Sequence, residues 1–277
     1  MRELRGLLAG LPAAAVAVSG GVDSTTLAVF AGRVLGERVE VFHARSPAVP
    51  PEATARVRRH AEREGWRLRV VDAGEFADPR YLANPVDRCY FCKRDLYGVI
   101  AAHTDAPLLA GTNTDDLAEY RPGLRAADEH RVRHPYLEAG LDKAAVRGLA
   151  RRLGLADLAE LPAAPCLASR VETGIPIRPE LLGAVHAVER ELSAWLGAVD
   201  VRCRLRADAV VVEVDAGTLD RLDAADRARI GSVATARWRD QGVQRPVRVE
   251  AYRRGSAFLV PPSTPAPAVP TNGTFGQ

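Results

Sequence analysis

The chain has 277 residues, of which 47% are hydrophobic and 26% charged, and its formal net charge at pH 7 is +3. This composition is typical of a soluble globular protein that forms one large domain or two modest ones. The mild charge and the absence of a long basic block, a membrane-length apolar run or a signal peptide predict neither a nucleic-acid nor a membrane partner. We therefore expect a cytoplasmic protein whose four cysteines serve metal or catalytic roles rather than disulfides.

Predicted strands and helices alternate through the N-terminal half of the chain. The predicted strands cover residues 13–18, 38–43, 67–72, 107–111 and 131–136. The predicted helices cover residues 1–10, 24–35, 52–64, 93–103 and 142–152. Alternation at this pace indicates βαβ units, and therefore an α/β fold with a doubly wound parallel sheet. Ligands of such sheets bind beyond the carboxyl ends of the strands.

The pattern changes after a proline-marked connector over residues 161–179. The elements predicted beyond it are a helix over 179–196, strands over 200–206, 209–215 and 246–252, and helices over 216–241. Residues 261–277 are rich in Pro, Thr and Gly and predict a disordered tail. We therefore divide the chain into a nucleotide-binding domain (1–172), a smaller α+β domain for substrate binding or oligomerisation (173–260), and the tail.

A glycine-rich turn joins the strand over 13–18 to the helix over 24–35. The start of that helix offers unpaired backbone N–H groups and a positive dipole end, which together favour phosphate. No lysine follows the glycines, so this is not a Walker A loop. An ordinary glycine-rich turn at the end of a strand is the alternative to a phosphate-binding loop. The turn resembles the PP-loop of ATP pyrophosphatases, which split ATP into AMP and pyrophosphate. The resemblance implies ATP binding, with Mg²⁺ placed by Asp23, at Ser19, Gly20, Gly21, Val22, Asp23 and Ser24.

Three cysteines lie in two short motifs. Cys89 and Cys92 form a C-x-x-C pair just before the helix expected to open at Lys93, and Cys166 follows a proline. A redox pair is one reading of the C-x-x-C, whereas a zinc site lacks a fourth ligand. Three thiolates from separate segments fit an iron–sulfur cluster that leaves one iron open. Cys203 lies on a predicted strand, where a small buried hydrophobe is expected.

Six segments, taken together and in chain order, resemble the LarE family of ATP-dependent sulfur transferases, which help to build the nickel-pincer nucleotide. These segments are SGGVDS at 19–24, RCYFCK at 88–93, GTNTDD at 111–116, YRPGLRAA at 120–127, PCLASR at 165–170 and AYRRGS at 251–256. The resemblance implies adenylation of a pyridinium-3,5-biscarboxylic acid mononucleotide. Its carboxylates then become thiocarboxylates, with release of AMP and pyrophosphate.

The resemblance assigns the sulfur chemistry to the cysteines. In one branch of the family, sulfur is taken from a single cysteine, here Cys166, which is left as dehydroalanine. In the other branch, cysteines that match Cys89, Cys92 and Cys166 hold a [4Fe–4S] cluster with an extra sulfide on its open iron. Because this chain has all three cysteines, it resembles the cluster branch, in which turnover is catalytic.

The resemblance also assigns roles to four basic residues. Lys93 would neutralise pyrophosphate, with an ordinary surface lysine as the alternative. Arg170 would bind substrate phosphate or pair locally. Arg202 and Arg204 would face an anionic phosphate, for which guanidinium is suited, or lie on a solvated strand face.

Acidic and amide residues complete the implied site. Either Glu189 or Glu191 would be a metal ligand in the C-terminal domain. Asp115 would lie beside the nucleotide or cap a helix. The other residues expected beside the nucleotide are Gly111, Asn113 and Asp116.

Two further expectations concern the family pattern. Relatives often carry Trp-Asp-Lys before the third cysteine, whereas this chain has DLAEL at 157–161, which changes the contacts expected there. Members of the family form closed homo-oligomers, so the resemblance predicts one here.

Three other functions fit parts of the pattern. A tRNA-thiolating PP-loop enzyme also adenylates and moves sulfur, but it needs a basic RNA-binding surface that this composition does not supply. An ammonia-dependent amidating synthetase of the NAD synthetase kind would not need the cysteines. A non-catalytic iron–sulfur or nucleotide-binding module would bind ATP without releasing pyrophosphate.

Overall fold

A parallel sheet of four strands forms the centre of the N-terminal part of the chain in the computed structural model, which describes residues 1–163, 165–197 and 200–259. The strands, in the order β3-β2-β1-β4, are β1 (Ala14–Ala17), β2 (Val39–Ala44), β3 (Arg67–Val71) and β4 (Leu108–Leu109). In the central strand β1, Val16 pairs in parallel with Val41 of β2 and with Leu109 of β4. The predicted α/β fold with a parallel sheet is confirmed.

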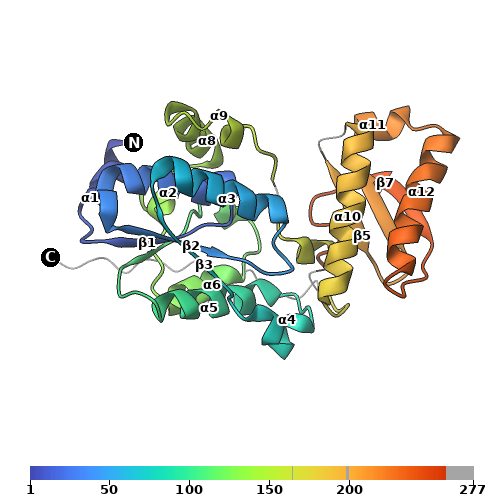
Figure 1. Cartoon of the computed structure of the whole chain (residues 1–277), viewed down its shortest axis with the longest axis horizontal. Helices are drawn as coiled ribbons and strands as arrows, with labels where there is room; N and C mark the ends of the chain where they lie inside the picture. Colours follow the sequence, from blue (N-terminus) through green and yellow to red (C-terminus); the bar gives the residue numbers. More distant parts are fainter. Residues whose placement is uncertain (164, 198–199, 260–277) are drawn as a thin grey trace.

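Helices cover both faces of this sheet (Figure 1). Because side chains alternate along a strand, Ala14 and Val16 of β1 enter one core, with α1, α2, α3 and α8. Ala15 and Ala17 enter the other core, with α5 and α6. The helices of this part are α1 (Arg2–Ala9), α2 (Val22–Leu35), α3 (Pro51–Glu64), α4 (Pro79–Leu82), α5 (Arg88–Ala101), α6 (Gly123–Glu129), α7 (Pro135–Glu138), α8 (Lys143–Arg152) and α9 (Ala156–Ala159).

Two of the predicted elements differ from the structure. The strand expected over 131–136 is wrong: a single parallel bridge joins Arg133 to Leu109, and α7 begins at Pro135. Proline lacks a backbone N–H and has a fixed φ, so it suits the first position of a helix better than a strand. The helix expected to open at Lys93 begins at Arg88, which places the C-x-x-C pair inside its first turns.

A second, three-stranded sheet lies in the C-terminal part of the chain, at the right of Figure 1. Its strands, in the order β5-β6-β7, are β5 (Val201–Leu205), β6 (Val210–Val214) and β7 (Val247–Ala251). β5 and β6 form an antiparallel hairpin, and β7 runs parallel to β6. The helices of this part are α10 (Pro179–Leu196), α11 (Ala216–Arg221) and α12 (Ala224–Arg239).

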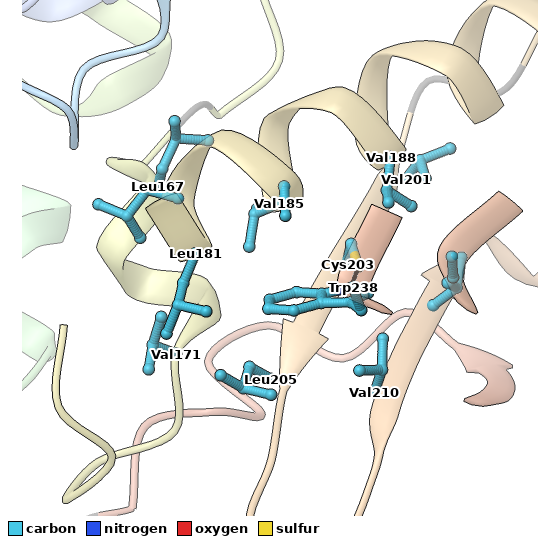
Figure 2. Packing of buried hydrophobic residues seen from close by; sticks show 14 of the residues in the cluster. Leu167, Val171, Leu181, Val185, Val188, Val201, Cys203, Leu205, Val210 and Trp238 are labelled. Atoms are coloured by element: carbon cyan, nitrogen blue, oxygen red, sulfur yellow. Dashed lines mark hydrogen bonds between the residues drawn. The ribbon is translucent and has the colours of Figure 1, made fainter. Parts of the chain in front are cut away.

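The core of this part confirms the burial predicted for Cys203. Figure 2 shows Cys203 of β5 against Trp238 of α12, whose indole Nε1 lies 3.3 Å from the cysteine sulfur. The connector also contributes, since Leu167 and Val171 pack in the same core as α10. The boundary drawn at residue 172 stays a prediction, and the tail predicted over 261–277 lies outside the described residues.

None of the helices in the described ranges has the length and apolarity that a membrane crossing requires.

Candidate functional site

The glycine-rich turn has a conformation that only glycine adopts easily. Gly20 has a φ of +81°, and a Cβ placed there would lie 2.7 Å from the carbonyl oxygen of Ala53. The hydroxyl of Ser24 accepts a hydrogen bond from the backbone N–H of Ser19 at 3.0 Å and lies 3.1 Å from the Ser19 hydroxyl. α2 begins at Val22, two residues earlier than predicted, so its unpaired first-turn N–H groups belong to the turn itself.

The loop after β4 packs directly against this turn. A Cβ on Gly111 would lie 2.8 Å from the backbone nitrogen of Ser24. The buried Asn113 donates from Nδ2 to Oδ1 of Asp23 at 3.3 Å, and its backbone N–H donates to Asp116 at 3.1 Å. The structure therefore brings Gly111, Asn113 and Asp116 beside the turn, and their contact with a nucleotide stays a prediction.

A lysine that no sequence motif singles out lies in the same place. The Nζ of Lys143, at the start of α8, is 2.5 Å from Oδ2 of Asp23. The phenol of Tyr136 donates to the backbone carbonyl of Asp23 at 3.1 Å. Composition offers a signal for this lysine, because Lys93 and Lys143 are the two lysines of the whole sequence. A compact ammonium at this position supplies the positive charge that a Walker A lysine would supply to phosphates.

The segments that carry the three cysteines expected at the sulfur site lie in one region. Cys89 and Cys92 are half-buried on α5, and Cys166 is exposed in the connector. Cys92 packs against the core cluster that contains Leu167, the neighbour of Cys166. Burial raises the pKa of the Cys89 and Cys92 thiols, and the charge of Cys166 raises both further.

Lys93 lies on α5, one residue after Cys92. Its Nζ lies 5.6 Å from the ring centroid of Tyr97. Tyr97 and the three cysteines raise the pKa of Lys93, whereas burial lowers it. Burial lowers the pKa of His134, on which the charges of Lys93 and Asp116 also act.

The described residues contain no set of three or more His, Cys, Asp or Glu side chains arranged to hold a metal ion, so the metal site expected from Cys89, Cys92 and Cys166 gains no support from their arrangement. Glu189 instead forms a two-pronged ion pair with Arg170 at 2.9 and 3.1 Å. Glu191 pairs with Arg237 at 3.0 Å. The prediction that one of these glutamates ligates a metal therefore gains no support from their contacts.

The arginines surround the segment that bears Cys166. Arg170 is buried and donates to the carbonyls of Pro165 at 2.7 Å and Cys166 at 3.2 Å. Arg202 donates to the carbonyl of Ala163 at 2.9 Å, and Arg204 to that of Ser169 at 3.3 Å.

Arg202 and Arg204 do not lie on a solvated strand face. Their residues are 8% and 3% exposed, and burial lowers the pKa of Arg202. Arg204 forms a 2.7 Å ion pair with Glu213, whose side chain is fully buried. Sequence reasoning missed Glu213, because the register of the hairpin pairs it with Arg202 and so sets it diagonally across from Arg204.

A cavity of about 590 Å³ opens beyond the carboxyl end of β2, between α3 and α10. It is lined by Arg45, Arg58 and His186 together with apolar side chains that include Leu167. This volume is within the range of small-molecule sites, which commonly lie beyond the strand ends of such sheets.

Known proteins resemble the chain over most of its length, although no protein-family model matches it. It is 37% identical, over 77% of its length and 81% of the relative, to an uncharacterized protein of Synechocystis. It is 32% identical, over 64% of its length and 62% of the relative, to one component of the glutamine-hydrolyzing GMP synthase of Methanopyrus kandleri. It is 31% identical, over 72% of its length and 73% of the relative, to the pyridinium-3,5-bisthiocarboxylic acid mononucleotide synthase of Lactiplantibacillus plantarum. The chain has the glycine-rich turn and, packed against it, the loop after β4, and it shares its sequence with these relatives. It therefore belongs to the family of that synthase, the LarE family of PP-loop proteins.

Proposed function

We propose that the protein is an ATP-dependent sulfur transferase that converts the carboxylates of a pyridinium-3,5-biscarboxylic acid mononucleotide into thiocarboxylates. The observation that carries this proposal is that α5, which bears Cys89, Cys92 and Lys93, packs through Cys92 against the core cluster of Leu167, the neighbour of Cys166. An amidating or purely nucleotide-binding protein has no need of thiols at this position. The name of the Lactiplantibacillus plantarum relative describes the same product class.

Adenylation is the task of the glycine-rich turn. The first-turn N–H groups of α2 and the ammonium of Lys143 bind the β- and γ-phosphates of ATP. A substrate carboxylate then attacks the α-phosphorus and pyrophosphate leaves, which forms an acyl adenylate. Asp23 and Asp116 would hold a Mg²⁺ ion on the phosphates, since carboxylate oxygens are its preferred protein ligands.

The thiols would deliver sulfur to the acyl carbon and displace AMP. Thiolates are the usual ligands of iron–sulfur clusters, and Cys89, Cys92 and Cys166 would be those ligands here, although the described structure does not arrange them as a metal site. When bound, a [4Fe–4S] cluster would present sulfide from its fourth iron. Arg202 and Arg204 would hold the substrate phosphate near the Cys166 segment, to which both donate hydrogen bonds.

A second candidate reaction is favoured by the exposure of Cys166. In this reaction the Cys166 sulfur attacks the acyl adenylate, AMP leaves, and β-elimination from the thioester yields a thiocarboxylate and dehydroalanine. Each protein molecule would then carry out only one sulfur transfer. Its mass would fall by the mass of H₂S because Cys166 becomes dehydroalanine, whereas the cluster route leaves the polypeptide unchanged.

The test is incubation of anaerobically purified, cluster-loaded protein with ATP, Mg²⁺ and the biscarboxylic mononucleotide. We expect AMP, pyrophosphate and a product mass that shows replacement of oxygen by sulfur. Cys166→Ala should abolish that product, whereas Cys203→Ala, in the C-terminal core, is the matched control. Product without sulfur, or full sulfur transfer by the Cys166→Ala variant, would overturn the proposal.

A further inference from the structure

Arg88, the first residue of α5, carries a buried positive charge that lacks an anionic partner in the described part of the chain. The residue is 3% exposed. Its Nη1 donates to Oδ1 of Asn84 at 2.7 Å, and its guanidinium carbon lies 5.6 Å from the ring centroid of Phe258. Its Nε is buried and has no hydrogen-bond partner among the described residues. A buried guanidinium with an unused donor and only neutral contacts is a site prepared for an anion.

Asn84 fixes this guanidinium in place. Asn84 is fully buried and has a φ of +53°, a left-handed conformation that asparagine tolerates better than most residues. Its Nδ2 donates to the carbonyls of Val171, Glu172 and Ile175 at 3.3, 2.8 and 2.9 Å. Arg88 is thereby held against the connector that begins with Cys166, so its free donor keeps one orientation.

Tyr81 has a second unused donor. It is 2% exposed, and its hydroxyl is buried without a hydrogen-bond partner in the described structure. Tyr81 packs in one core cluster with Cys92 and Leu167, the neighbour of Cys166. Burial raises the pKa of Tyr81, and Cys166, Cys92 and Arg88 are among the charges that act on it. Tyr81 therefore packs beside Cys92 and the connector, the same connector against which Asn84 holds Arg88.

The chain's own carboxylates do not supply the missing anion. Glu75 is 3% exposed, and its charge raises the pKa of both Tyr81 and Cys92. Its Oε2 has no hydrogen-bond partner, and no ion pair joins it to Arg88 within the described ranges. Cys89 and Cys92 follow Arg88 on α5, and the proposed function brings sulfur anions to these thiols. Guanidinium and phenol donors form strong charge-assisted hydrogen bonds to such anions.

We propose that Arg88 and Tyr81 form a binding site for a sulfur anion, which they hold beside Cys89, Cys92 and Cys166 before its transfer. The anion is either a free hydrosulfide held beside the thiols without a covalent bond to them or a sulfide presented by a cluster. This inference deepens the proposed function and rests on it, because it identifies the residues that retain the sulfur between its arrival and its delivery.

The first experiment measures the melting temperature of the reduced, metal-free full-length protein against increasing sodium hydrosulfide. A ligand that binds only the folded state raises the melting temperature with concentration. We expect this rise in the wild type, its loss in Arg88→Met, a reduced rise in Tyr81→Phe, and partial retention in Arg88→Lys, which keeps the charge. Arg125→Met is the matched control, because Arg125 is an exposed arginine next to α5 that pairs with Asp87 at 3.5 Å.

The second experiment measures labile sulfide and the iron–sulfur absorption spectrum of reconstituted protein. We expect Arg88→Met to retain less sulfide per iron than Arg125→Met, and to form about 10- to 100-fold less thiocarboxylate, the loss of one ionic hydrogen bond. A response only in the first experiment identifies a free hydrosulfide held beside the thiols, and a response only in the second identifies a cluster-bound sulfide.

Equal behaviour of Arg88→Met and the wild type in both experiments would overturn the inference. A lower basal melting temperature with an unchanged hydrosulfide response would instead show a purely structural role for Arg88. If Arg88→Met does not fold, Arg88→Lys and Tyr81→Phe decide the outcome by the same measurements. Absence of any thiocarboxylate from the wild type would refute the proposed function separately, since hydrosulfide binding does not depend on the substrate.

Discussion

The ammonium of Lys143 and the carboxylate of Asp23 lie 2.5 Å apart, which joins the first turn of α8 to the first turn of α2. Both side chains are partly exposed, at 33% and 26%, so solvent weakens their attraction. The pair therefore contributes little to stability, and each member remains able to meet phosphate or a cation.

Replacement of Lys143 by Met should slow pyrophosphate release by about 10- to 100-fold, because one charge-assisted contact to the phosphates is lost. The free energy of unfolding should change by less than about 1 kcal/mol, as for exposed ion pairs. Steady-state pyrophosphate release and urea denaturation measure the two effects. Lys143→Arg serves as the control that keeps the charge, and an unchanged rate in Lys143→Met would remove Lys143 from the phosphate site.

Gly111→Ala should disturb the start of α2, because the new Cβ would lie 2.8 Å from the backbone nitrogen of Ser24. Such overpacking costs about 1–3 kcal/mol, and we expect weaker ATP binding with it. Gly6→Ala is the matched control, since nothing lies within 4 Å of its new Cβ and it is inside α1. That control should gain roughly 0.5–1 kcal/mol. Denaturation and equilibrium ATP binding would test both, and loss of ATP binding in both variants would contradict the argument.

Glu213→Gln should lower the free energy of unfolding by about 3–5 kcal/mol, because it leaves the buried Arg204 without its carboxylate partner. Glu191→Gln breaks an exposed ion pair with Arg237 and should cost no more than about 1 kcal/mol. Urea denaturation of the two variants compares a buried and an exposed pair in one protein. Equal small losses would mean that Arg204 has another anionic partner.

Stability should fall as the pH drops below about 6.5, the ordinary pKa of histidine. His43 is 1% exposed, its ring nitrogens lie 2.8 Å from the carbonyl of Val18 and from the hydroxyl of Thr54, and burial lowers its pKa. The unfolded chain therefore binds a proton that the folded chain does not, so unfolding becomes easier on acidification.

This pH dependence is measured as the free energy of unfolding between pH 7.5 and pH 5.5. A single such histidine contributes at most about 1.4 kcal/mol per pH unit. His43→Gln should flatten the slope by up to that amount, whereas His103→Gln, an exposed histidine, should leave it unchanged. An identical slope in both variants would show that His43 is not the group responsible.

Local patterns were sufficient for the elements that carry the phosphate turn. Small and β-branched residues predict β1, and the turn signal at Gly20 and Gly21 marks the start of α2 to within two residues. The strand expected over 131–136 failed because one apolar alternation does not outweigh Pro135 at the start of α7.

The site was harder to predict where its groups come from distant segments. Lys143 meets Asp23 only because α8 packs against α2, which no motif spacing records. The burial of Arg202 and Arg204 depends on carbonyls of the connector and on the register of the β5–β6 hairpin. The motifs predicted which residues carry the chemistry, whereas their partners follow from tertiary packing.

Arg170 ties the segment of Cys166 to α10, since one guanidinium bonds both the Cys166 carbonyl and Glu189. Asn84 ties the continuation of the same segment to α5. Any shift of α10 relative to α5 would therefore pull on the peptide that positions the third thiol. In the proposed reaction, the two halves of the chain would jointly set the distance over which sulfur travels, and neither half alone would align donor and acceptor.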